Sequence, residues 1–201
     1  MRAHLIITGA SSGIGRELAL QAFPRGYPLT LLGRNHDRLA EVSSLCGGAE
    51  WHAFDLSDSV ARAHFVAGVT GPVILVNNAG LFDYALFADQ DPGAIEAMIA
   101  ANLTAPILLT RALMPRLAGL VNVLSVAAQQ PFTGSAVYCA TKAGLDLWAR
   151  SLALEQPELP VHNFYPGPVD TPIWEDVSLD IPAEAKRDPA DLAREILDAL
   201  A

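Results

Sequence analysis

The chain has 201 residues, of which 51% are hydrophobic and 17% are charged, and its formal net charge is −9 at pH 7. This length suits one domain with a sizeable core, and the composition excludes a disordered chain. The acidic balance, without any Lys/Arg cluster, excludes a nucleic-acid-binding surface. We therefore expect a single domain over residues 1–201 that acts on a small molecule.

Short apolar runs alternate along the chain with longer stretches of helical periodicity, which is typical of a parallel sheet covered by helices on both faces. The runs predict six strands, at residues 3–8, 28–33, 50–55, 72–77, 119–125 and 160–166. The longer stretches predict helices at residues 13–25, 36–45, 58–67, 92–117, 136–156 and 189–200. Two of these begin with an Asp-Pro pair, a typical helix start. The order of elements predicts an α/β fold with a Rossmann-like, doubly wound parallel sheet of about six strands.

Cysteine use and hydropathy bear on location. The two cysteines, Cys46 and Cys139, are far apart and form no CxxC pattern, which predicts neither a disulfide framework nor a zinc site. The apolar run at residues 5–7 is too short for a signal peptide or a membrane span. The five histidines show no ligand spacing. We expect a cytoplasmic protein with no membrane segment and no metal.

The first predicted strand ends in the stretch TGASSGIG at residues 8–15, which leads directly into a helix. Glycines at 9, 13 and 15 allow a tight turn and a close approach of the backbone to a pyrophosphate at the helix N-terminus. The alternative is an ordinary turn. The position of this glycine stretch between the first strand and the first helix favours a dinucleotide site instead.

The glycine turn and the motifs that follow it resemble the short-chain dehydrogenase/reductase family over nearly the whole chain. The family's glycine pattern is TGxxxGxG, and its other motifs come in the same order, namely NNAG at 77–80, Asn102, Ser125, Tyr138 with Lys142, and PGPVDT at 166–171. The resemblance implies an NAD(P)-binding oxidoreductase. Family members commonly add a seventh strand, which we do not expect here because no apolar strand follows the last predicted helix.

The resemblance also implies a set of cofactor contacts along one edge of the sheet. By motif match, the set consists of Gly9, Ser11, Ser12, Gly13, Ile14, Gly15, Arg34, Asp55, Leu56, Asn78, Ala79, Gly80, Tyr138, Lys142, Val169 and Thr171. Within it, Asp55 and Leu56 are assigned to the adenine edge, and residues 78–80 to the strand end beneath the nucleotide.

The end of the second predicted strand bears on the choice between NAD and NADP. An acidic residue there would hold the ribose of NAD, but the stretch LLGRN has Gly33 in that place and Arg34 next to it. A guanidinium is a bidentate donor suited to a 2′-phosphate, so we predict NADP(H) and consider NAD(H) less favoured. The alternative is that Arg34 is a solvated surface residue. Many NADP-dependent relatives carry a second basic residue where Ser12 stands, and Arg38 is a candidate substitute.

Tyr138 and Lys142 lie one helical turn apart, so both can face one pocket. An ammonium nearby, together with an oxidised nicotinamide, would lower the pKa of the phenol from about 10 toward the working range. Ser125 can hydrogen-bond the substrate oxygen. Taken singly, these are an ordinary helix pair and a strand-end cap; with the glycine turn they predict a catalytic set. The resemblance adds Asn102, which would hold a water that links Lys142 to solvent through a local helix distortion.

Three segments after the strands would shape the substrate pocket, at residues 81–87, 126–137 and 168–179. Their side chains predict apolar or aromatic walls, with one possible polar contact from Gln129, and the wall residues are Phe82, Tyr84, Phe132, Ile173 and Trp174. The lid after residue 171 is expected to be short. Cys139 is interpreted as a small packing residue rather than a nucleophile.

The sequence thus predicts an NADP(H)-dependent oxidoreductase that interconverts a carbonyl and an alcohol. Two alternatives remain, a non-catalytic NADP(H)-binding redox sensor or scaffold and a structural partner subunit. Residues 97–114 are apolar on more than one helical face, which predicts a homodimer through the fourth and fifth predicted helices, at residues 92–117 and 136–156.

Overall fold

The computed structural model describes residues 2–175, 177, 179 and 181–200. Within this part of the chain, six strands form one sheet in the order β3-β2-β1-β4-β5-β6, and every neighbouring pair is parallel. The strands are β1 (His4–Thr8), β2 (Leu29–Gly33), β3 (Glu50–Ala53), β4 (Val73–Asn77), β5 (Leu117–Val123) and β6 (Val161–Phe164). The strand order reverses between β1 and β4, the switch point at which open α/β sheets bind ligands. The predicted doubly wound fold is confirmed.

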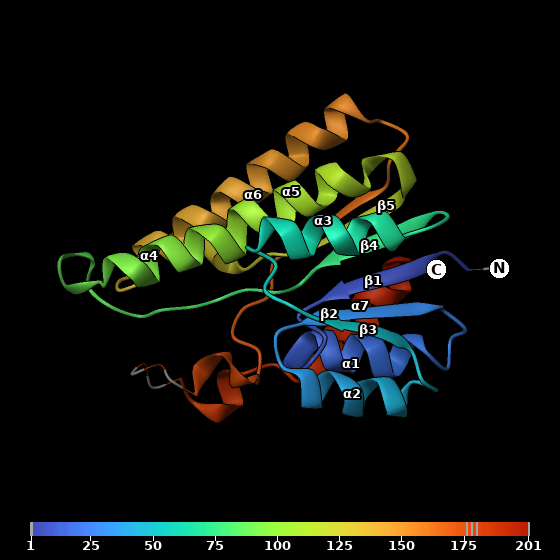
Figure 1. Ribbon diagram of the computed structural model, residues 1–201. Helices are drawn as coiled ribbons and strands as arrows, with labels where there is room; N and C mark the ends of the chain where they lie inside the picture. The colour runs from blue at the N-terminus through green and yellow to red at the C-terminus, as the bar shows by residue number, and fades with distance from the viewer. Residues whose placement is uncertain (1, 176, 178, 180, 201) are drawn as a thin grey trace.

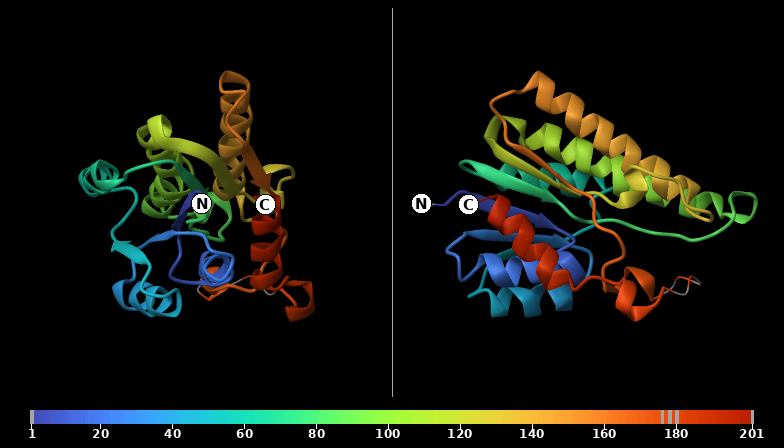
Figure 2. Two further views of the ribbon diagram at one scale, coloured as in Figure 1. Left: turned by 90° about the vertical axis from the view of Figure 1, so that its right-hand side faces the viewer. Right: turned by 180° about the vertical axis from the view of Figure 1, so that it is seen from behind.

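Helices cover both faces of the sheet, as Figure 1 shows. One layer, above the sheet in that view, contains α3 (Ser59–Gly68), α4 (Pro92–Ile99), α5 (Ala105–Leu113) and α6 (Ala136–Glu155). The opposite layer contains α1 (Gly13–Ala22), α2 (His36–Leu45) and α7 (Pro189–Ala199). Figure 2 shows the same layers from the side and from behind.

Each face of the sheet has its own apolar cluster because successive strand residues point to opposite faces. Leu5 and Ile7 of β1 join the cluster under α1 and α7, whereas Ile6 between them joins the cluster under α5. All three side chains are almost fully buried. Parallel strands buried on both sides are therefore continuous apolar runs, which is the pattern that predicted them.

The long predicted helix at residues 92–117 is interrupted. Between α4 and α5 the backbone forms a π turn at Ala100–Thr104, and a 3₁₀ turn follows at Met114–Arg116. Single π turns inside helices are frequent at functional sites. Asn102 lies in this turn with only 1% of its surface exposed. The distortion expected at Asn102 is therefore present.

Other boundaries differ by a few residues from those predicted. The first helix ends at Ala22, shortly before Pro24, instead of at residue 25. Strand β5 occupies Leu117–Val123 because Ser125 already caps a 3₁₀ turn at Val126–Ala128, where its side-chain oxygen accepts from the N–H of Ala127 at 3.1 Å. Proline and capping residues determine where these elements end, and apolar periodicity alone does not predict such ends.

One helical stretch among the described residues, Pro92–Arg116, is long and apolar enough to cross a membrane by length and composition, with a mean hydropathy of 1.4. Its inner side includes Leu109 and Leu113, which are fully buried against the sheet. The core helix of a soluble protein passes the same test, and the buried inner side of this stretch fits such a helix.

Candidate active site

A cavity of about 1210 Å³ opens at the carboxyl ends of the strands and extends across the switch point. Most of the residues predicted from the sequence line it, namely Gly9, Ser11, Ser12, Gly13, Ile14, Arg34, Asp55, Leu56, Asn78, Ala79, Gly80, Ser125, Tyr138, Lys142, Val169 and Thr171. Gly15 and Asn102 are not among its lining residues and lie behind its wall. The structure thus brings segments that are far apart in the sequence to one surface.

The glycine turn forms one end of the cavity, and its backbone leaves no room for a side chain at its three glycines. Gly9 and Gly13 have φ values of +68° and +52°, in the left-handed region that favours glycine. A Cβ at Gly15 would lie 2.6 Å from Nδ2 of Asn78 and even closer to the carbonyl oxygen of Gly9. Only glycine at position 15 therefore lets α1 begin this close to β4, with its N-terminal amides directed at the cavity.

Thr8 fixes the turn to the neighbouring strand at the switch point. Its hydroxyl accepts from the backbone N–H groups of Asn78 at 2.9 Å and Ala79 at 3.0 Å and donates to the carbonyl of Val76 at 3.1 Å. Nδ2 of Asn78 in turn donates to the carbonyl of Thr8 at 2.8 Å. The loops after β1 and β4 are therefore held at a set distance before any ligand binds.

Charged groups line the cavity at the ends of β2 and β3. Arg34 follows β2 directly and is exposed, and neither it nor Arg38 forms an ion pair among the described residues. Asp55 follows β3, and the pKa of its carboxyl is lowered because Ser57 donates to it from its hydroxyl at 2.7 Å and from its backbone at 2.8 Å, with a smaller contribution from the charge of Arg34. The cavity therefore offers a free cation and a fixed carboxylate at these strand ends.

Tyr138, Lys142 and Ser125 meet near the middle of the cavity. The Nζ atom of Lys142 lies 5.7 Å from the centre of the Tyr138 ring and donates to the carbonyl of Val123 at 3.0 Å. Burial lowers the pKa of Lys142 to about 8. Burial also raises the pKa of Tyr138 to about 12, against which a hydrogen bond with Ser125 acts in the lowering direction.

In this cavity the pKa of Tyr138 is raised, whereas we expect Lys142 together with an oxidised nicotinamide to lower it. The physical reason is that both side chains are buried, and burial disfavours the charged form of each. At neutral pH the phenol is therefore a protonated donor, and the ammonium is a buried charge without a carboxylate partner among the described residues.

Asn102 lies behind this cluster, and its side chain forms hydrogen bonds with Leu81 and Thr141. Its Oδ1 accepts from the N–H of Leu81 at 2.7 Å, and its Nδ2 donates to the carbonyl of Leu81 at 2.8 Å and to the hydroxyl of Thr141 at 3.3 Å. Thr141 lies between Tyr138 and Lys142 in α6. Asn102 therefore ties the loop after β4 to the helix that carries the two central residues.

Beneath the cluster, a row of amide side chains crosses three strands. Asn77, Asn122 and Asn163 are opposite one another in register, and Nδ2 of each donates to the next side chain, at 3.0 Å from Asn77 and at 2.9 Å from Asn122. Nδ2 of Asn163 donates to Asp146 at 3.3 Å, and Tyr165 donates to the same carboxylate oxygen at 2.7 Å. Because Asp146 lies one turn beyond Lys142, this row sets the position of α6 on the sheet.

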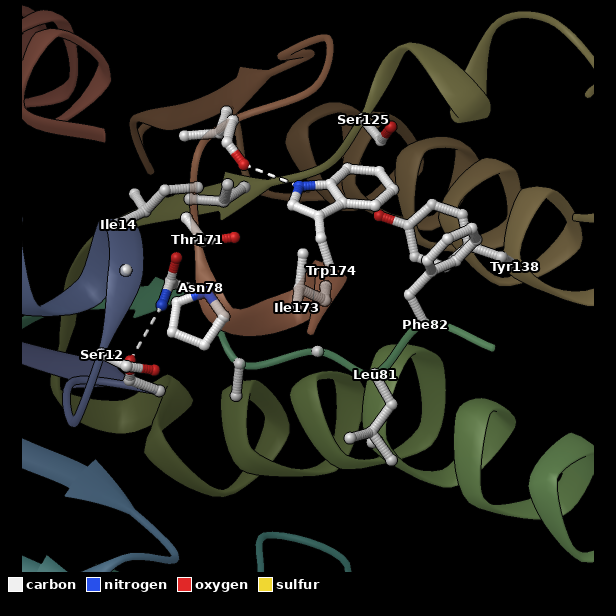
Figure 3. Close-up of a pocket in the computed structure, with 18 of the residues that line it drawn as sticks. Ser12, Ile14, Asn78, Leu81, Phe82, Ser125, Tyr138, Thr171, Ile173 and Trp174 are labelled. Atoms are coloured by element: carbon white, nitrogen blue, oxygen red, sulfur yellow. Dashed lines mark hydrogen bonds between the residues drawn. The ribbon is translucent and has the colours of Figure 1, made fainter. Parts of the chain in front are cut away.

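The far end of the cavity is aromatic. Phe82 contacts Tyr138 and Trp174, with ring centres 4.8 Å and 5.4 Å apart and both pairs edge to face (Figure 3). All the predicted wall residues line the cavity, whereas Gln129 does not. The predicted apolar character of this end is therefore present without the suggested polar contact.

Sequence reasoning missed several groups that build this site. The carbonyl of Val123, which accepts from Lys142, is a backbone atom and has no signal in the sequence. Thr8 and Ser57 are small polar residues whose partners come from register and loop geometry. The amide row had a weak signal, since each asparagine lies in a predicted strand, Asn77 at its end and Asn122 and Asn163 in the middle of theirs.

Comparison with known proteins agrees with this geometry. The family profile described as short chain dehydrogenase matches residues 3–182. The chain is 35% identical to sepiapterin reductase of Xenopus tropicalis over 192 residues, which cover 83% of this chain and 74% of that protein. It is 34% identical to benzil reductase ((S)-benzoin forming) of Bacillus subtilis, again over 83% of this chain and 74% of the relative.

Solved structures give the same result. An alcohol dehydrogenase from the archaeon Thermococcus sibiricus, complexed with 5-hydroxy-NADP, superposes with a TM-score of 0.92 at 25% identity over 100% of this chain and 91% of its own. A putative short chain dehydrogenase from Escherichia coli CFT073, complexed with NADPH, superposes with a TM-score of 0.90 at 28% identity over 99% and 90% of the two chains.

Proposed function

Since the chain belongs to the short-chain dehydrogenase family, an oxidoreductase family, we propose that it is an NADP(H)-dependent enzyme that interconverts a carbonyl group and an alcohol. We treat residues 1–201 as one domain that holds both cofactor and substrate. The observation that carries the proposal is the position of Ser125, Tyr138 and Lys142 in the wall of the same cavity that the glycine turn begins. Asn102 completes the proposed catalytic set from behind that wall.

The glycine turn and the residues at the ends of β2 and β3 fit NADP(H). The glycine turn leaves room for a pyrophosphate at the N-terminus of α1, and a Cβ at Gly13 would lie 2.8 Å from Cγ2 of Thr171. Gly33 leaves no carboxylate at the end of β2, and the guanidinium of Arg34 stands beside it for a 2′-phosphate. Asp55 with Leu56 would border the adenine, and Lys142 and Tyr138 the nicotinamide ribose.

Ser125, Tyr138 and Lys142, near the middle of the cavity, can supply the proton-transfer chemistry. When bound, the reduced nicotinamide supplies the hydride for the carbonyl carbon. Tyr138, whose raised pKa of about 12 keeps it protonated, donates its proton to the carbonyl oxygen, and Ser125 holds that oxygen by a hydrogen bond. The buried ammonium of Lys142 stabilises the phenolate that remains. The π turn at Asn102 would admit a water that returns a proton from solvent.

The substrate is proposed to be a small, apolar or aromatic carbonyl compound. The relatives named sepiapterin reductase, benzil reductase and L-xylulose reductase support a small carbonyl compound in general. The rings of Phe82 and Trp174 next to Tyr138 favour an apolar or aromatic one. No polar contact from Gln129 is included, because that side chain does not line the cavity.

The preference for NADP is tested by binding. NADPH and NADH are titrated separately against the protein, with Trp fluorescence as the signal, in the wild type and in Arg34→Ala. We expect NADPH to bind at least about tenfold tighter, as for the loss of one charge-assisted pair, and Arg34→Ala to remove that difference. Arg194→Ala, on the exposed side of α7, is the matched control and should keep it. Equal affinities that Arg34→Ala leaves unchanged would refute the preference.

The reaction is tested with a panel of ketones, aldehydes and quinones, followed by the absorbance of the reduced nicotinamide. Tyr138→Phe should lower kcat by about 10²- to 10⁴-fold, the usual contribution of general acid catalysis. Tyr84→Phe, which removes another hydroxyl of the cavity lining, should change it little. Activity that survives Tyr138→Phe would refute the mechanism. Tight NADPH binding without turnover across the panel would instead favour the non-catalytic redox sensor.

We also propose a cytoplasmic homodimer. Apolar side chains remain exposed on α4, α5 and α6, namely Ile99 at 40%, Leu108 at 42%, Leu147 at 63% and Leu154 at 86%. A second copy would cover them. Both cysteines are free, in keeping with a reducing compartment. Sedimentation at micromolar concentration should show a dimer that Leu147→Glu dissociates; a wild-type monomer would contradict this.

A further inference from the structure

The segment between β6 and α7 closes on itself at its base. The N–H of Asp170 donates to the carbonyl of Arg187 at 2.9 Å, and the N–H of Arg187 donates to the carbonyl of Pro168 at 2.9 Å. These two bonds form an isolated parallel bridge between Val169 and Arg187. The side chain of Arg187 also pairs with Glu195 of α7 at 2.7 Å. The base of the segment is therefore fixed to the body of the protein.

Trp174 is anchored to this base. It ends a 3₁₀ turn at Pro172–Trp174, and its Nε1 donates to the carbonyl of Val169 at 2.7 Å. A half-buried indole N–H needs such a partner, and the anchored strand end supplies it. Figure 3 shows the result, in which the indole points back into the cavity, with its ring on the side of Ser125 and Tyr138. The orientation of the indole is thus set before a substrate binds.

Phe82 connects this indole to the proposed proton donor. Its ring is tilted by 68° against Tyr138 and by 71° against Trp174, so the three rings form an edge-to-face corner. The backbone next to Phe82 is fixed as well, because both polar groups of Leu81 bond to Asn102. Two aromatic walls beside Tyr138 are therefore held by hydrogen bonds to separate parts of the fold.

We propose that Trp174, together with Phe82, is a specificity-determining residue that selects ketones whose carbonyl carbon carries an aromatic ring. This inference rests on the proposed function. A ring conjugated to a carbonyl lies in the carbonyl plane, so it extends along the aromatic corner when the oxygen meets Ser125 and Tyr138. Edge-to-face contacts favour a flat arene there beyond the area it buries, and a puckered saturated ring of the same size cannot form them. Walls that are already in place need no ordering when the substrate binds.

The test compares two ketones of similar size, phenyl methyl ketone and cyclohexyl methyl ketone, with NADPH. The readout is the ratio of their kcat/KM values within one variant, in which effects on folding and cofactor affinity cancel. Conjugation makes the phenyl ketone intrinsically less reactive, so the change of this ratio from wild type to variant is the informative quantity. Aromatic contacts of this kind are typically worth about two- to twelvefold each.

We expect Trp174→Leu to lower the phenyl-to-cyclohexyl ratio by about tenfold. Trp174→Phe keeps a ring but loses the bond to Val169 and should fall between the wild type and the leucine variant. Phe23→Leu is the control, because it removes a partly exposed aromatic ring at the C-terminal end of α1 that does not line the cavity, and it should leave the ratio within about twofold, the size expected without an aromatic contact.

The outcomes separate the inference from the proposed function. A ratio that Trp174→Leu leaves unchanged, or an equal fall for both ketones, overturns the role of Trp174, while turnover of the cyclohexyl ketone still supports the proposed function. No turnover of either ketone or of the wider panel by the wild type overturns the proposed function and this inference together.

Discussion

Lys142 carries a buried ammonium, and Lys142→Met tests what that charge costs the folded protein. The side chain is only 5% exposed, and its hydrogen bond to the carbonyl of Val123, at 3.0 Å, replaces just part of its hydration. Burial lowers its pKa from the ordinary 10.5 to about 8. At about 1.4 kcal/mol per pH unit, the charged form destabilises the cofactor-free fold by about 3 kcal/mol.

The lowered pKa sets the sign of the pH dependence. Below about pH 8, Lys142 is protonated in the folded and the unfolded chain, and the full destabilisation is present. Between about pH 8 and 10.5, the unfolded chain keeps the proton that the folded chain releases, so the free energy of unfolding rises with pH. Tyr138 acts in the other direction, because its raised pKa lets the unfolded chain ionise first between about pH 10 and 12.

Urea unfolding of the cofactor-free protein at pH 7 and pH 9.5 measures the effect. Lys142→Met removes the charge but leaves the Val123 carbonyl without its donor, at about 1 kcal/mol, so the variant should be about 2 kcal/mol more stable at pH 7. By pH 9.5 the wild type should have gained about 2 kcal/mol relative to the variant. Lys186→Met, at a partly exposed lysine, is the control and should show no such pH dependence. A Lys142→Met protein that is less stable at pH 7, or a difference independent of pH, would refute the reasoning.

Three further substitutions test the scaffold of the site. Gly15→Ala places a Cβ 2.6 Å from Nδ2 of Asn78, so NADPH affinity should fall at least about tenfold in a fluorescence titration, whereas Gly68→Ala, with open space around it, should leave it unchanged. Asn122→Leu breaks the amide row on both sides and should lower the free energy of unfolding by about 2–3 kcal/mol; a loss below about 0.5 kcal/mol would show the row to be dispensable. Asp58→Ala removes the cap of α3, for which urea unfolding should show a loss of about 1 kcal/mol without any change in NADPH affinity.

The strands were predictable where burial on both faces makes the strand a continuous apolar run, as in β1 and β4. Their ends were less so. Strand β5 stops at Val123, since Ser125 caps the next turn, and a hydroxyl in that place could equally have continued the strand. The interruption at Asn102 came from the family resemblance, because nothing in the apolar pattern of residues 92–117 marks a π turn.

The lining of the cavity was predictable where a sequence motif marks the residue, as at Gly13 and Arg34, which both line the cavity. The pKa of Tyr138 was not. Its spacing to Lys142 predicts an interaction between the two, but burial, which is the largest cause of the raised pKa, depends on every element around them. The anchor of Trp174 was hidden for a similar reason, since its acceptor is a backbone carbonyl.

The two pKa shifts at the centre of the cavity also bear on how stability and the proposed reaction are linked. A phenolate at Tyr138 and an ammonium at Lys142 are each disfavoured alone in this buried place. In the proposed reduction, proton donation by Tyr138 creates the anion that the ammonium lacks, so part of the energy lost in folding is recovered along the reaction. A methionine at position 142 removes both effects. Greater stability and lost turnover in Lys142→Met are therefore expected together, because they follow from one buried charge.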